Sequence, residues 1–325
     1  GHQGLIMPTT DRSSAVTARI AELISLYGAA DASAAWLLCD RHDPASLAYR
    51  IMDENLVAHD LSYGQLREAS ECFAAALKSL GVGPGDRVAT LMGKSRDYLV
   101  ALMGIWRLGA VHVPLFTAFA PSAIGLRLLG SGAKAVICDA AQRAKLLPGP
   151  DIPADAPWRV IATGAAGHGA LSFDELVAGN ASGLPAAAMG GDAPIIHIYT
   201  SGTTGNPKGV VVPLRALASF HAYAEFGFDL RPDDVFWCAA DPGWAYGLYF
   251  GVLATFLTGV PSLLLEGGFS AEKTYAVLAG QGVTNFAAAP TVYRSLRAAD
   301  VPAPAGLKLR CASSAGEPLT PEVND

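Results

Sequence analysis

A glycine- and hydroxyl-rich run between two apolar stretches contains the residue types that bind phosphate. The run reads Thr200-Ser201-Gly202-Thr203-Thr204-Gly205-Asn206-Pro207-Lys208-Gly209, and it lies between the apolar stretches 194–198 and 210–212. Its glycines let backbone N–H groups turn toward a ligand without a Cβ in the way. Consecutive N–H groups, hydroxyl donors and a lysine ammonium together suit a polyphosphate. Gly202 to Gly205 alone would be an ordinary turn, but the complete run favours phosphate binding.

The run is not a Walker A loop, which places glycine directly before its lysine and serine or threonine directly after it. Pro207 precedes Lys208 here, and Gly209 follows it. The run instead resembles the signature loop of the AMP-forming adenylate synthetases, a superfamily that includes acyl-CoA synthetases, luciferases and the adenylation domains of peptide synthetases. The resemblance implies that the loop holds the phosphates of ATP while a carboxylate attacks the α-phosphorus.

A second informative segment is the turn Asp241-Pro242-Gly243-Trp244, which leads into an apolar helix. Taken alone, it would be a turn whose aromatic residue has only a packing role. It resembles the Asp-x-Gly-Trp segment of acetyl-CoA and medium-chain acyl-CoA synthetases, which lines the acyl pocket and the approach of the pantetheine thiol. The resemblance implies an apolar slot for a short or aromatic acid, lined by Trp244, Tyr246, Leu248 and Tyr249. For Leu248 and Tyr249, plain helix packing is the alternative.

A third segment, Ser313-Ser314-Ala315-Gly316-Glu317-Pro318, also follows a predicted strand. Gly316 permits a close backbone approach, and Pro318 restricts the turn. By composition the segment is a turn before a helix. It resembles the Gly-Glu-Pro segment of the same family, which flanks the base and ribose of the nucleotide. The resemblance therefore implies that Gly316, Glu317 and Pro318 bind the nucleotide.

The reaction implied by the resemblance joins a carboxylic acid and ATP into an acyl-adenylate and pyrophosphate, and then forms a thioester with CoA. Nucleotidyl transfer depends mainly on positioning and charge neutralisation. Lys208 would supply positive charge, and Thr204 would lie near Mg²⁺, a cation that prefers oxygen ligands. These two residues are the expected catalytic residues. The expected phosphate contacts are Thr200, Ser201, Gly202, Thr203, Thr204, Gly205 and Lys208.

Strand-type and helix-type segments alternate along the chain. Ser62 and Gln65 have the spacing of a capping box at the start of a helix that ends before Gly81, and a leading helix over 9–35 precedes it. Strands are expected over 87–92, 111–113, 135–138, 159–163, 235–238, 262–265, 284–288 and 307–313, and helices over 98–108, 121–129, 215–227, 246–257, 270–280 and 291–299. This alternation predicts an α/β fold, with parallel sheets and helices on both sheet faces. Ligands of such sheets bind outside the carboxyl ends of the strands, where the phosphate loop lies.

The expected organisation is two α/β subdomains. Residues 1–8 are interpreted as a tag remnant and a natural start at Met7. The low complexity of 178–191 predicts a boundary between a first subdomain, 9–190, and a second subdomain, 191–325, that carries the phosphate loop. The family continues with a further glutamate for Mg²⁺ and a mobile C-terminal domain that bears a catalytic lysine. We therefore expect an N-terminal portion with little or no synthetase activity by itself.

Composition excludes several other classes of function. The formal charge of −6 gives no basic footprint for nucleic acid, and no apolar run is long enough to span a membrane. Five scattered cysteines without a C-x-x-C pair suggest reduced thiols in a cytoplasm. We expect a cytoplasmic, magnesium-dependent acid–thiol ligase of fatty acid metabolism that acts on a short- or medium-chain or aryl acid.

Two other functions remain open at this point. The same adenylation chemistry could load the phosphopantetheine of a carrier protein instead of CoA, although the Asp241–Trp244 turn favours CoA. A non-catalytic nucleotide-binding module is the second alternative. The sequence also leaves open whether two chains form a homodimer.

Overall fold

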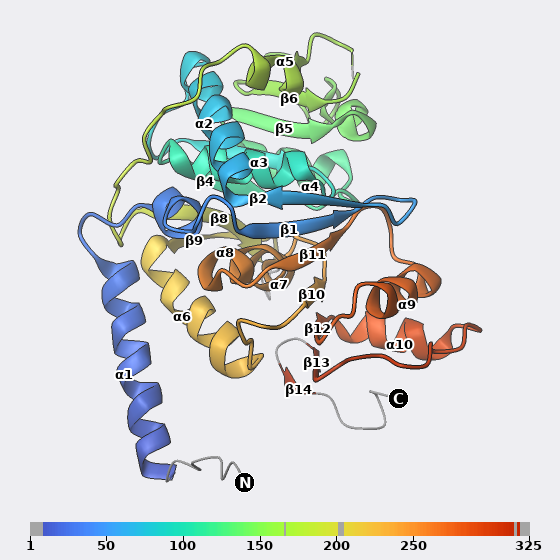
Figure 1. Cartoon of the computed structure of the whole chain (residues 1–325). Coiled ribbons are helices and arrows are strands. Elements are labelled where there is room, and N and C mark those ends of the chain that lie inside the picture. The colour runs from blue at the N-terminus through green and yellow to red at the C-terminus, as the bar shows by residue number, and fades with distance from the viewer. Residues whose placement is uncertain (1–8, 166, 201–204, 315–316, 319–325) are drawn as a thin grey trace, which may run out of the picture.

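The structure is a computed structural model that describes residues 9–165, 167–200, 205–314 and 317–318. Within these residues, two seven-stranded sheets form the centre of the molecule (Figure 1). Sheet I has the order β7-β6-β5-β3-β4-β8-β9, and sheet II has the order β14-β13-β12-β10-β11-β1-β2. Sheet I consists of β3 (Arg87–Leu91), β4 (Val111–Pro114), β5 (Ala135–Asp139), β6 (Arg159–Thr163), β7 (Leu171–Ser172), β8 (Pro194–Thr200) and β9 (Lys208–Pro213). Sheet II consists of β1 (Leu47–Met52), β2 (Ala58–Ser62), β10 (Phe236–Ala239), β11 (Ser262–Leu265), β12 (Asn285–Ala288), β13 (Cys311–Ser314) and β14 (Glu317–Pro318).

Helices pack on both faces of each sheet. The α-helices are α1 (Thr9–Gly28), α2 (Tyr63–Ser79), α3 (Arg96–Arg107), α4 (Pro121–Ser131), α5 (Phe173–Ala178), α6 (Leu217–Ala222), α7 (Ala245–Leu248), α8 (Ala254–Thr258), α9 (Ala271–Gly280) and α10 (Pro290–Ala298). Short 3₁₀ or π-helical segments are η1 (Trp36–Asp40), η2 (Ala140–Leu146), η3 (Leu214–Ala216), η4 (Tyr223–Gly227) and η5 (Tyr249–Leu253). The main core lies between the sheets and includes α2, α3 and α8, whereas α4 covers the other face of sheet I and α9 and α10 cover that of sheet II.

The predicted α/β class is confirmed, because most neighbouring strands are parallel. Three antiparallel pairs, β1–β2, β8–β9 and β13–β14, lie at sheet edges and were not predicted. Each sheet contains strands from both sides of the predicted division at residue 190. Strands β8 and β9 extend sheet I, while β1 and β2 extend sheet II through the pairing of Tyr49 with Ser262. The division into two subdomains at residue 190 stays a prediction.

Several element boundaries differ from the prediction for identifiable reasons. The leading helix ends at Gly28 rather than residue 35, at the point where a Cβ on Gly191 would lie 2.7 Å from the Gly28 Cα. The predicted connection 164–191 contains β7 and α5, and the Ser172 hydroxyl caps α5 by accepting from the Glu175 N–H. The predicted capping box is confirmed, since Ser62 and Gln65 exchange hydrogen bonds of 3.1 and 3.0 Å. Among the described residues, no helix combines the length and apolar character needed to cross a bilayer.

Candidate active site

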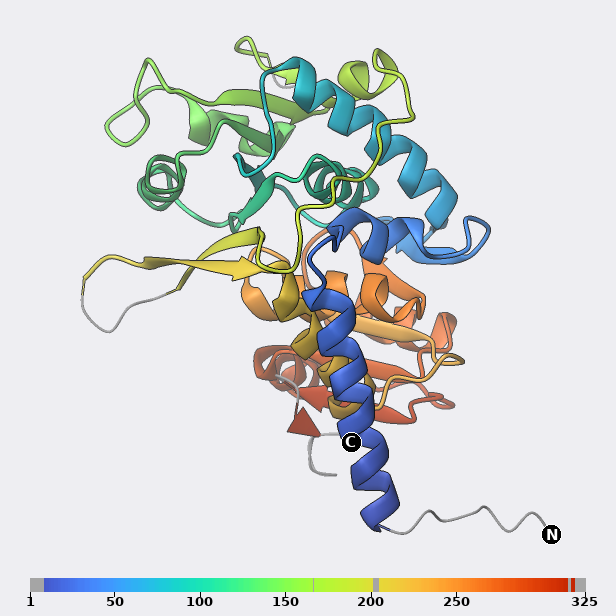
Figure 2. The same cartoon turned by 90° about the vertical axis from the view of Figure 1, so that its left-hand side faces the viewer.

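The phosphate-loop segment joins β8 to β9, a hairpin that projects beyond the rest of sheet I (Figure 2). Thr200 pairs with Lys208 across the base of this loop, and both side chains are exposed. Gly205 has a φ of 81°, a left-handed conformation that favours glycine. The predicted contacts Ser201, Gly202, Thr203 and Thr204 lie outside the described residues. The structure thus places Thr200, Gly205 and Lys208 in one short segment at the carboxyl end of β8 and the start of β9.

The turn after β10 is held by its own aspartate. The Gly243 N–H donates to Asp241 Oδ1 at 2.7 Å, and the Trp244 N–H donates to the Asp241 carbonyl oxygen at 3.2 Å. A Cβ at Gly243 would lie 2.7 Å from the Cα of Phe116, which follows β4. Glycine is therefore required here, because the turn of sheet II packs directly on the chain that leaves sheet I.

Trp244 belongs to an aromatic patch that the sequence did not reveal. Its ring centroid lies 5.1 Å from that of Phe116 and 5.5 Å from that of Phe119, and the two phenylalanine rings lie 5.7 Å apart. We call Phe116, Phe119 and Trp244 the aromatic patch. Trp244 remains 46% exposed, so a ligand can reach its ring. The available sequence signal was an aromatic pair directly after a predicted strand.

The other predicted pocket residues divide into two groups. Leu248 is fully buried in the main core, which favours packing as its role. Tyr249 stacks on Phe220 with a centroid distance of 4.1 Å, which again favours packing. Tyr246 is half-buried one residue into α7, and its ring lies 5.5 Å from that of Phe250. Trp244 and Tyr246 therefore remain the better candidates for contact with a substrate.

Arg127 connects the aromatic patch to the strand that enters the loop. Its Cζ lies 4.2 Å from the centroid of the Phe119 ring and 5.6 Å from that of Tyr199. Tyr199 directly precedes Thr200 and is also stacked on His197 at 5.2 Å. The contact sequence Trp244–Phe119–Arg127–Tyr199 thus brings the turn after β10 and the base of the phosphate loop into one region. No sequence motif marks Arg127, because its contacts join separate elements.

A lysine near Asp241 was also missed. Lys94 follows β3, and it has no hydrogen bond or ion pair with any described residue. Burial lowers the pKa of Lys94, while the charge of Asp241 opposes this shift. Four residues later, in α3, the buried Tyr98 hydroxyl is also close enough to feel the charge of Asp241, and it has no hydrogen-bond partner in the described part of the chain. Lys94, Tyr98 and Asp241 therefore form a polar group at the junction of the two sheets.

The third predicted segment lies at the end of β13. Ser314 pairs with Glu317, and Ser313 pairs with Pro318, in a short antiparallel bridge; Gly316 lies outside the described residues. The Tyr293 hydroxyl donates to the Ser313 carbonyl oxygen at 2.7 Å and fixes the end of β13. The Ser314 hydroxyl is buried and lacks a partner among the described residues.

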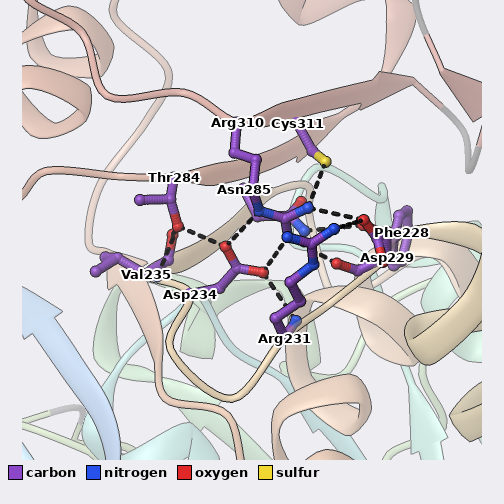
Figure 3. A network of polar contacts seen from close by, with 9 residues as sticks. All are labelled: Phe228, Asp229, Arg231, Asp234, Val235, Thr284, Asn285, Arg310 and Cys311. Carbon is purple, nitrogen blue, oxygen red and sulfur yellow. Dashed lines mark hydrogen bonds and ion pairs between the residues drawn. The ribbon is translucent and has the colours of Figure 1, made fainter. Parts of the chain in front are cut away.

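A polar network with a structural role lies at the amino ends of the sheet II strands, opposite the candidate site (Figure 3). Arg310 precedes β13 and contacts Asp234 at 2.5 Å and Asp229 at 2.8 Å, while the Thr284 hydroxyl donates to Asp234 at 2.7 Å. Burial raises the pKa of Asp234, but hydrogen bonds from Arg310, the Arg231 N–H and Thr284 outweigh it and hold that pKa below its usual value. The network ties together the amino ends of β10, β12 and β13, whose carboxyl ends bear the candidate site.

The described residues contain no group of three or more His, Cys, Asp or Glu side chains that could hold a metal ion. Thr204, the residue expected near Mg²⁺, lies outside those residues. The structure therefore provides no geometry for a metal.

The sequence of this chain is similar to those of known proteins. A family model described as AMP-binding enzyme matches residues 46–325. Acetyl-coenzyme A synthetase of Bacillus subtilis is 32% identical over 267 residues, covering 81% of this chain and 46% of that protein. The acetyl-coenzyme A synthetase of Pseudoalteromonas translucida is 34% identical over 293 residues, covering 81% and 44%. The chain thus spans about half the length of the curated relatives it matches.

Solved structures show the same similarity. The crystal structure of a Brucella canis acyl-CoA synthetase superposes with a TM-score of 0.85 at 38% identity, covering 95% of this chain and 58% of the other. A benzoate CoA ligase from Burkholderia xenovorans LB400 superposes with a TM-score of 0.74 at 26% identity, covering 91% and 55%.

Proposed function

Because the chain belongs to the AMP-binding enzyme family, we propose that it forms the nucleotide- and acyl-binding part of an AMP-forming carboxylic acid–CoA ligase. The observation that carries this proposal is the contact sequence Trp244–Phe119–Arg127–Tyr199. It unites a loop suited to phosphate with an exposed tryptophan suited to an apolar acid. An acid–thiol ligase needs both kinds of ligand side by side.

In the first step, a carboxylate oxygen of the acid attacks the α-phosphorus of ATP. The bond from the α-phosphorus to its bridging oxygen breaks, and pyrophosphate leaves. We assign the phosphates to the segment from Thr200 to Lys208, whose ammonium offsets the negative charge. Glu317 and Pro318, with Gly316, would border the base and ribose. Bound Mg²⁺ would be held at Thr204 and would neutralise phosphate charge.

In the second step, the sulfur of CoA attacks the acyl carbon, and AMP leaves with the oxygen that came from the acid. Trp244 and Tyr246 would border the acyl group, with the exposed side of the aromatic patch facing the incoming thiol. We propose a short- or medium-chain or aryl acid as the substrate. Relatives named as acetyl-coenzyme A synthetase and benzoate CoA ligase support this range.

The test uses the protein encoded by the complete reading frame. Acid-dependent exchange of labelled pyrophosphate into ATP is expected with at least one of acetate, butyrate, octanoate and benzoate. CoA is expected to accept the acyl group, whereas a holo carrier protein is not. Absence of exchange with every acid, while the protein still binds ATP in calorimetry, would contradict the ligase and favour a nucleotide-binding module. Residues 1–325 cover less than half of the curated relatives, so we propose that they have little activity alone.

A further inference from the structure

Arg127 is a buried cation without a counter-charge. Its side chain projects from α4, and the residue is only 7% exposed. Nη1 donates to the Ala123 carbonyl oxygen of the same helix at 3.0 Å. Within the described residues, no carboxylate forms an ion pair with Arg127. Burial lowers the pKa of Arg127, while Tyr199 opposes that shift.

Such an arrangement costs folding free energy. A charged group loses its hydration on burial, and without an ionic partner little of that loss is returned. The faces of Phe119 and Tyr199 offer partial compensation, because aromatic ring faces attract cations. A methionine or leucine could fill the same space without the desolvation cost. The position therefore calls for an explanation beyond stability.

The two rings that hold Arg127 belong to different parts of the site. Phe119 lies in the aromatic patch against Trp244. Tyr199 pairs with Gly209 across the hairpin, one residue pair below Thr200 and Lys208. The Tyr199 hydroxyl also packs on α4, since a Cβ at Gly130 would lie 2.6 Å from it.

We propose that Arg127 is a positioning residue that fixes the base of the phosphate loop relative to the aromatic patch. Its planar guanidinium contacts one ring from each of the two elements, so it sets their separation. The effect on catalysis rests on the proposed function. In that reaction the acid held near Trp244 must reach the α-phosphorus held by the loop. Small errors in such placement reduce rates strongly.

The first test does not depend on activity. Hydrogen exchange is measured by mass spectrometry over residues 194–213 in the complete protein and in R127M, R127K and R159M. R159M is the control variant. Arg159 is an exposed arginine at the start of β6, so this substitution removes one guanidinium from the surface. We expect R127M to raise exchange about tenfold around residues 198–200 and 208–210, R127K to raise it less, and R159M to leave it unchanged. Unchanged exchange in R127M would overturn the proposal.

The second test is kinetic. In pyrophosphate exchange, R127M is expected to lower kcat about 30-fold, with the KM for ATP and for the acid within about twofold of wild type. R127K should recover part of the loss, because it retains the cation. Combined with R127M, the substitution F119L should add little, since both disrupt the same contact. A raised KM for ATP with unchanged kcat would show instead that Arg127 binds a ligand anion. If the wild-type protein showed no pyrophosphate exchange, the ligase function would be contradicted. The hydrogen-exchange result would still decide the positioning role.

Discussion

The hydroxyl oxygen of Tyr27 and Nδ1 of His221 lie 2.7 Å apart in a buried contact that joins α1 to α6. Arg41 Nη2 donates to the same hydroxyl oxygen at 3.1 Å, which leaves the hydroxyl proton for His221 Nδ1. His221 Nε2 in turn donates to Glu225 at 2.9 Å. With the Tyr27 proton directed at Nδ1, both ring nitrogens are satisfied when the imidazole is neutral and carries its proton on Nε2. The folded protein therefore favours neutral His221.

This contact predicts a loss of stability in weak acid. Burial lowers the pKa of His221 to about 4, against a value of about 6.5 in an unfolded chain. The unfolded state therefore binds more protons between these values, so the contribution is complete above about pH 6.5 and is lost as pH falls toward 4. We expect wild type to lose about 2 kcal/mol more than H221Q between pH 7 and pH 5 in urea unfolding. An equal loss in both proteins would contradict the assignment.

The Arg310–Asp234 contact predicts a second effect on stability. R310M leaves the buried Asp234 carboxylate without its cationic partner, and we expect a loss of about 2 kcal/mol in the free energy of unfolding. R231M is the matched control, because among the described residues the Arg231 side chain pairs only with the exposed Asp229, and it should cost less than about 0.5 kcal/mol. Similar costs for the two variants would show that the network in Figure 3 does not anchor the strands.

Gly243 provides a test of the close contact between the two sheets. An added methyl group would lie 2.7 Å from the Phe116 Cα and 3.0 Å from Asp241 Oδ1, so G243A must displace the turn. We expect a loss of about 1–3 kcal/mol in thermal or urea unfolding. G268A serves as the control, since no heavy atom outside its immediate neighbours lies within 4 Å of its added Cβ. If G243A were as stable as G268A, the packing of the turn on Phe116 would be incorrect.

Lys208 allows a direct test of phosphate binding. Its ammonium is exposed beside Thr200 at the base of the loop, where a bound polyphosphate would neutralise it. We expect K208Q to weaken ATP binding about tenfold in calorimetry, with less effect on AMP, because the β- and γ-phosphates carry the contact. K308Q, at an exposed lysine before β13, should bind ATP like wild type. Equal weakening for ATP and AMP would argue against a β- and γ-phosphate contact.

Sequence patterns correctly predicted structural features that depend only on residues close together in the chain. The Ser62–Gln65 capping box and the strand over 262–265 were correct, because hydroxyl spacing and short apolar runs act within one element. Pairing between distant segments left no such signal. The β1 strand is held by β11, and the leading helix ends where Gly191 packs on Gly28.

The same distinction applies to the candidate site. Motifs made Trp244 and the loop residues candidates, whereas Phe119 and Arg127 become candidates only when β4, α4 and β8 come together. Leu248 was ambiguous because a helix next to a ligand also packs on the core. Its complete burial favours packing on the core.

The central claim is that this chain positions a carboxylate to attack the α-phosphorus of ATP, and oxygen isotopes test it most directly. The complete protein is supplied with ATP, CoA and a substrate acid that carries ¹⁸O in both carboxylate oxygens. The account predicts that each AMP released contains one ¹⁸O atom on its phosphate, found by mass spectrometry. Unlabelled AMP, or label in inorganic phosphate released beside ADP, would contradict it.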